Sequence, residues 1–138
     1  MAQEKRIVSF KDLEVYQNTY QAMLVVMREI IPKLPDSEKF DLKDQLSRCV
    51  KAAPRLIAEG YGKRHQTSGF QRYLDDAIGE CNEAVVCLEQ CKDIYGIEPE
   101  VCDKQIKIYD QSARQLFRLA EAWDKFKKRF PKPTNQSF

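Results

Sequence analysis

The residues of this chain best placed for chemistry are basic. Six lysines and arginines recur in the segment 99–130, and at 100° per residue they fall within about 80° of one another around a helix axis. The six residues are Lys104, Lys107, Arg114, Arg118, Lys125 and Arg129. They form a track about 37 Å long. A phosphate backbone binds such a track because each neutralised phosphate releases counterions. The spacing therefore predicts nucleic-acid binding. The alternative is a solvated helix face, because Glu100 lies within the track.

A second set of residues is predicted to form contacts between subunits. Basic side chains share the outward face of the segment 37–63, and acidic side chains flank a glycine on the outward face of the segment 68–94. The predicted interface residues are Arg48, Lys51, Arg55, Glu59, Gly79 and Glu83. A glycine there allows another backbone to approach closely. A head-to-tail contact between the two faces would close into a ring where the rotation allows it. The alternative is a salt-bridge pattern between neighbouring helices of one chain.

Catalytic and metal sites are not expected. Glu59 would need a second titratable group beside it to act as an acid or base, and the sequence nominates none. His65 is the only histidine, and a solvated loop position or a phosphate contact suits it best. The five cysteines (Cys49, Cys81, Cys87, Cys91 and Cys102) include no C-x-x-C pair. Cys87 is about 33 Å along the helix from His65, so the two cannot share a zinc ion. Buried, reduced cysteines that act as small apolar side chains are predicted, and no cofactor.

Composition favours one compact, cytoplasmic, helical domain. The chain has 138 residues, 43% of them apolar, and only five glycines, which disfavours an all-β fold with many tight turns. The net charge of +2 hides a segregation. Residues 41–64 sum to +3, residues 68–93 to −4 and residues 99–130 to +3. The longest apolar run, residues 22–27, is far too short to span a membrane, and no signal peptide is evident. The segregation of charge along the chain indicates partners with charged surfaces.

Four helices must position these residues. The periodicity predicts them at about 9–31, 37–63, 68–94 and 99–130, followed by a frayed tail at 131–138. Ser9 and Asp12 form an S-x-x-D capping box that would begin the first helix. Pro54 is expected to kink the second helix, Gly96 to end the third, and Pro99 to open the fourth. Four amphipathic helices with short connections predict an all-α, antiparallel up-and-down four-helix bundle as a single domain, 1–138.

Apolar side chains define the face that each helix should bury. In the first helix the predicted core face is Leu13, Tyr16, Tyr20, Met23, Leu24, Met27, Ile30 and Ile31. In the fourth it is Val101, Ile108, Tyr109, Leu116, Leu119, Ala120, Trp123 and Phe126. The second and third helices show the same periodicity, with residues such as Leu46, Ile57, Leu74 and Leu88 on one side.

Several motifs resemble one known family. Residues 9–16 read SFKDLEVY, similar to its SFxDLxVY opening, and residues 57–63 read IAEGYGK, similar to its IAEGYGR stretch. Leu42, Gln45, Leu46 and Arg48 match an L-x-x-Q-L-x-R run. Phe70, Tyr73, Leu74, Ala77, Gly79 and Glu83 match a later F-x-x-F-L-x-x-A-x-G-S-x-x-E pattern. The resemblance, over about residues 7–95, is to the four-helix-bundle proteins encoded in intervening sequences of bacterial 23S ribosomal RNA genes.

The resemblance implies a four-helix bundle that assembles into a ring-like homopentamer. It also implies an accessory role, since relatives serve diversity-generating retroelements by binding a reverse transcriptase and nucleic acid. Leu56 stands where the family has Asn, and Glu80 where it has Ser, so the polar contacts of those side chains do not carry over. The leading prediction is thus a non-enzymatic, oligomeric protein that binds RNA or DNA. The alternative is a scaffold that presents charged faces to a partner enzyme such as a reverse transcriptase.

Overall fold

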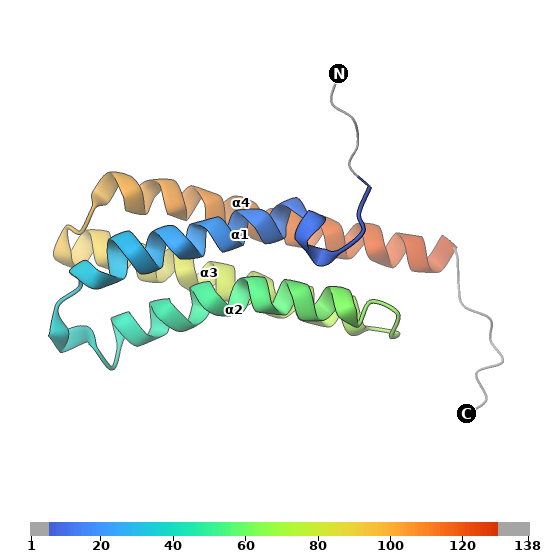
Figure 1. The fold of residues 1–138 in the computed structure, drawn as a ribbon, viewed down its shortest axis with the longest axis horizontal. Helices are drawn as coiled ribbons and strands as arrows, with labels where there is room; N and C mark the ends of the chain where they lie inside the picture. The colour runs from blue at the N-terminus through green and yellow to red at the C-terminus, as the bar shows by residue number, and fades with distance from the viewer. Residues whose placement is uncertain (1–5, 130–138) are drawn as a thin grey trace, which may run out of the picture.

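Four long helices make up the structure, a computed structural model that describes residues 6–129. They are α1 (Glu14–Val25), α2 (Leu42–Gly62), α3 (Gly69–Tyr95) and α4 (Pro99–Arg129), and no strand occurs within residues 6–129. Successive helices run antiparallel, and each packs against the next (Figure 1). α1 also packs against α4, which closes the bundle. The predicted all-α four-helix bundle is confirmed.

The capping box at Ser9 is present, but it does not start the first α-helix. The Ser9 Oγ accepts a hydrogen bond from the amide of Lys11 at 3.1 Å, and Asp12 Oδ2 accepts one from the amide of Ser9 at 3.0 Å. These bonds cap a short 3-10 turn, Phe10–Asp12. Leu13 then adopts an extended backbone conformation (φ −71°, ψ 123°), so α1 begins at Glu14. The predicted start at residue 9 was therefore wrong by five positions.

The connection between α1 and α2 is longer than predicted. α1 continues into a π-helical turn, Val26–Ile30, and a 3-10 turn, Ile31–Lys33. A separate 3-10 turn, Asp36–Glu38, occupies the predicted start of the second helix, and α2 begins only at Leu42. The Glu38 carboxylate accepts a hydrogen bond from the amide of Leu42 at 3.2 Å. α2 then runs through the buried Pro54 to Gly62.

The end of α3 and the start of α4 agree with the sequence prediction. Gly96 has a left-handed backbone (φ 62°), and its amide donates to the Lys92 carbonyl at 2.9 Å, which ends α3 at Tyr95. Pro99 is the first residue of α4. The last predicted residue of this helix, 130, and the predicted tail at 131–138 lie outside the described residues.

The core lies along the axis of the bundle, but α1 is rotated from its predicted orientation. The residues that α1 and its π-helical turn bury are Val15, Thr19, Ala22, Val26 and Ile30. Tyr20, predicted to be buried, is 40% exposed. The misassignment arises because apolar side chains surround much of this segment, so periodicity alone does not select one face.

α4 buries a narrower and more polar face than predicted. Tyr109 and Leu116 are fully buried as expected, but Gln105 and Ser112 are buried beside them. Phe126, predicted to belong to the core, is 50% exposed. None of the helices within residues 6–129 is both long enough and apolar enough to cross a bilayer.

Candidate nucleic-acid and subunit interfaces

The six predicted phosphate-binding side chains lie on one exposed face of α4. Lys104, Lys107, Arg114, Arg118, Lys125 and Arg129 are all exposed. We call them the α4 basic stripe. The residues that α4 buries centre on a direction about 180° from this stripe, because both sets follow the same helical period. Burial of the apolar face thus fixes the basic stripe outward along most of α4, the longest helix.

One acidic residue, Glu100, lies within the arc of the stripe, and the other acidic residues of α4 lie on one flank of it. Asp110 forms an ion pair with Arg114 one turn away, and Asp124 pairs with Lys128 at 3.0 Å. Both pairs are exposed, so each contributes little to stability. A phosphate could therefore replace the carboxylate beside either cation at little cost. Lys107, Arg114 and Arg118 also line a shallow surface hollow with Asp110 and Gln111. The middle of the stripe therefore converges on one concave part of the surface.

The turn between α2 and α3 adds basic residues beside the C-terminal part of α4. Lys127 Nζ donates to the carbonyl oxygens of Gln66 and Thr67, the latter at 3.2 Å. Arg64 donates to the Tyr61 carbonyl at 2.6 Å, and its guanidinium lies 3.9 Å from the centre of the Tyr61 ring. His65 is exposed in the same turn. This end of the bundle thus brings together cations from two distant segments.

Four of the six predicted interface residues lie around one groove within a single chain. Arg48, Lys51 and Arg55 line a groove between the two helices together with Glu83. No ion pair within 4 Å joins Lys51, Arg55 or Glu83 to an opposite charge among residues 6–129, and Arg48 pairs instead with Asp44 at 3.5 Å. The groove thus holds basic side chains of α2 and acidic side chains of α3, and no ion pair within 4 Å joins one to the other across it.

Glu80 belongs to the same groove and was missed as a site residue in the sequence analysis. Burial raises the pKa of its carboxyl group above the ordinary value, and the nearby Glu83 carboxylate adds to the effect, whereas Arg48 opposes it. The three-residue spacing of Glu80 and Glu83 on one helix face was the signal available in the sequence.

Gly79 occupies an exposed position in the middle of α3. A Cβ atom added there would meet no atom within 4 Å. Glycine in a helix interior costs roughly 0.5–1 kcal/mol relative to alanine. The packing of this chain therefore supplies no steric reason for glycine at this position.

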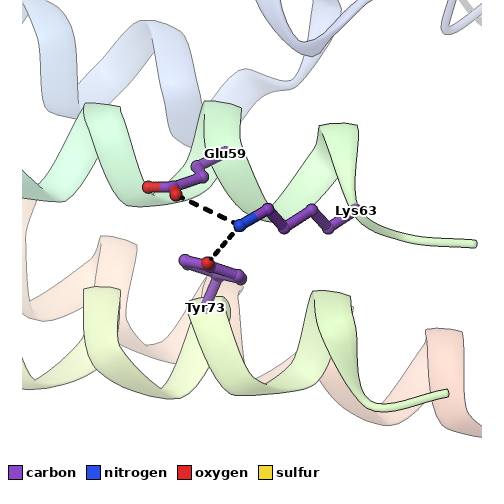
Figure 2. A network of polar contacts seen from close by, with 3 residues as sticks. All are labelled: Glu59, Lys63 and Tyr73. Carbon is purple, nitrogen blue, oxygen red and sulfur yellow. Dashed lines mark hydrogen bonds and ion pairs between the residues drawn. The ribbon is translucent and has the colours of Figure 1, made fainter. Parts of the chain in front are cut away.

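Glu59 belongs to a network of polar contacts with Lys63 and Tyr73 at the end of α2 (Figure 2). Lys63 Nζ lies 3.4 Å from Glu59 Oε2 and donates a hydrogen bond to the Tyr73 hydroxyl at 2.7 Å. The hydrogen bond to Tyr73 raises the pKa of the Lys63 ammonium group, and Glu59 adds to the effect. The three side chains tie the last turn of α2 to the start of α3, which is a structural role.

The cysteines and the histidine do not form a metal site within residues 6–129. All five cysteines are free thiols buried in the core, as predicted. Burial raises the pKa of Cys81 to about 12 and that of Cys91 to about 12, so both thiols stay protonated at neutral pH. A hydrogen bond to Cys87, together with burial, raises the pKa of Cys49 as well. Nowhere in residues 6–129 do three His, Cys, Asp or Glu side chains converge as a metal site requires.

Comparison with known proteins places the chain in one family. No curated protein matches it. The family model described as 23S rRNA-intervening sequence protein matches residues 11–118. The matched region begins at the N-terminal 3-10 turn and extends into α4 as far as Arg118, so it includes both the groove between α2 and α3 and the first four residues of the α4 basic stripe. With most of its length matched in this way, the chain belongs to the 23S rRNA-intervening sequence protein family.

Proposed function

We propose that this chain is a non-enzymatic accessory protein that binds RNA or DNA through the α4 basic stripe. The observation that carries the proposal is the exposure of all six stripe side chains on the face of α4 opposite the core. Phosphates of a nucleic acid strand lying along α4 would replace water and counterions around these cations. Arg114 would leave its exposed ion pair with Asp110 and bind a phosphate instead, at a small cost in free energy.

Assembly would multiply this surface. We propose a ring-like homo-oligomer, with a pentamer favoured by the family resemblance, in the cytoplasm. Each subunit would then supply one α4 basic stripe, and several stripes on one particle bind a long nucleic acid far more tightly than one. Such a particle suits an accessory role beside an enzyme that works on nucleic acid, such as a reverse transcriptase.

Fluorescence anisotropy with labelled RNA and DNA across a salt series tests the proposal. The wild-type protein should bind both, with affinity falling steeply as salt rises. The double variant Lys107→Glu with Arg118→Glu should bind more weakly and with a shallower salt slope. Arg28→Glu with Lys39→Glu reverses two exposed charges outside α4 and serves as the matched control. Equal loss in both double variants, or no salt-dependent binding by the wild type, would overturn the proposal.

A second candidate function is a protein-interaction scaffold. Gly79 and the charged groove between α2 and α3 favour it, because the open space over Gly79 admits another backbone. A scaffold would bind a partner protein and be indifferent to free RNA at low salt. The same anisotropy series, together with the native mass, separates the two functions.

A further inference from the structure

Phe117 is an exposed aromatic residue in the middle of the longest helix. Its side chain is 57% exposed, although large aromatic residues are usually buried for most of their area. At 100° per residue it lies outside the arc of the apolar residues that predict the core face of α4. The packing of this chain therefore does not account for an aromatic ring at this position.

Two arginines of the α4 basic stripe adjoin this ring. Arg114 precedes Phe117 by one turn, Arg118 follows it directly, and both side chains are exposed. All three line one hollow between α3 and α4. An aromatic face beside two cations is the combination that sequence-tolerant single-strand binders use, in which a base stacks while its phosphates are neutralised.

The other walls of the hollow suit the edge and face of a base. Ile78 and Ala113 supply apolar surface, and Asn82 on α3 is exposed at the rim. The remaining lining residue, Asp110, is the ion-pair partner of Arg114, so its charge is balanced within the hollow. A side-chain amide offers both a donor and an acceptor, which match the polar edge of an unpaired base. A mixed wall of this kind is less suited to a protein contact, which would need a larger continuous apolar patch.

We propose that Phe117 is a stacking platform for an unpaired nucleobase, and that the preferred ligand of the α4 basic stripe is therefore single-stranded nucleic acid. This inference rests on the proposed function and narrows it. Bases inside a duplex are already stacked on their neighbours, so a side chain on a helix surface reaches their faces only in single strands, loops or ends. The stripe binds the phosphates of any strand, whereas Phe117 distinguishes an unpaired strand from a duplex.

The test compares three probes on the full-length protein by fluorescence anisotropy. They are a labelled 20-nucleotide single strand, the matching duplex, and an abasic strand that keeps the phosphates but has no bases. Phe117→Ala should weaken binding of the single strand by roughly 5- to 100-fold, and leave binding of the duplex and the abasic strand unchanged. The salt slope should stay the same, because no phosphate contact is lost. Phe117→Trp should restore the affinity and show fluorescence quenching by the stacked base.

The possible outcomes separate this inference from the proposed function. If the wild type binds with steep salt dependence but Phe117→Ala binds the single strand equally well, the stacking platform is overturned and the basic stripe stands. A wild type that binds the abasic strand as tightly as the normal one also overturns it, and this result needs no variant. A lower native mass for Phe117→Ala would identify Phe117 as a subunit contact instead. Failure of the wild type to bind any of the probes would overturn both proposals.

Discussion

Gly60 of α2 lies against Tyr73 of α3, so closely that a Cβ atom on Gly60 would be 2.7 Å from the Cβ atom of Tyr73. Real Cβ atoms essentially never approach other atoms to this distance. The two helices can therefore reach their observed separation at this level only because residue 60 has no side chain. The hydrogen bond from Lys63, three residues after Gly60, to the Tyr73 hydroxyl joins the same two segments (Figure 2).

Substitution of Gly60 by alanine should consequently destabilise the bundle. The added methyl group forces α2 and α3 apart or shifts Tyr73, and overpacking of this kind costs about 1–3 kcal/mol of the free energy of unfolding. Gly62→Ala is the matched control in the same helix, because its new Cβ atom meets open space and should not lower the stability. Urea denaturation of both variants measures the difference. Equal stability of the two variants would contradict the steric argument.

Charge reversal at Glu83 should disrupt the proposed ring. Glu83→Lys adds a cation to a groove that already holds Arg48, Lys51 and Arg55, so a basic α2 face of a neighbouring subunit would be repelled. We expect a smaller native mass by light scattering. Glu89→Lys reverses an exposed charge elsewhere on α3 and should leave the mass unchanged. If the mass of Glu83→Lys equals that of the wild type, the groove is not a ring contact.

Loss of the N-terminal capping box should weaken the entry to α1. Asp12 Oδ2 accepts hydrogen bonds from the amides of Val8 at 2.8 Å and Ser9 at 3.0 Å. Asp12→Ala leaves both amides without this partner and should lower the free energy of unfolding by about 1 kcal/mol. Lys11→Ala changes only an exposed side chain in the same turn and is the control. Hydrogen exchange at the two amides should accelerate in Asp12→Ala alone.

The buried thiols predict a loss of stability at alkaline pH. Burial raises the pKa of Cys81 and of Cys91 from the ordinary thiol value of 9.0 to about 12. The folded state therefore holds these protons more tightly than the unfolded chain. The resulting stability is complete below about pH 9 and is lost as pH rises towards 12.

Between pH 9 and 12 each such thiol should remove about 1.4 kcal/mol of folding free energy per pH unit. Urea denaturation at pH 7.5 and at pH 10.5 measures the loss in the free energy of unfolding between these two pH values. Cys91→Ala should be less stable than the wild type at pH 7.5 but lose less on going to pH 10.5. An identical loss in the two proteins would mean that Cys91 ionises as freely in the folded state as in the unfolded one.

The sequence by itself determined the fold class and the outward direction of the basic stripe. The buried Tyr109 and Leu116 and the exposed Lys107 and Arg118 all obey one helical period, so local periodicity separates the two faces of α4 without tertiary information. The end of α3 and the start of α4 were equally local, since Gly96 and Pro99 act through their own backbone conformations.

Tertiary structure alone decided the orientation of α1 and the surroundings of the charged residues. Apolar side chains on several sides of α1 leave its buried face to be chosen by its neighbours, which bury Thr19 and expose Tyr20. The groove that brings Arg55 of α2 near Glu83 of α3, and the hollow that joins Phe117 to Asn82, depend on how helices pack side by side. Periodicity describes one helix at a time, whereas these contacts join side chains from different helices.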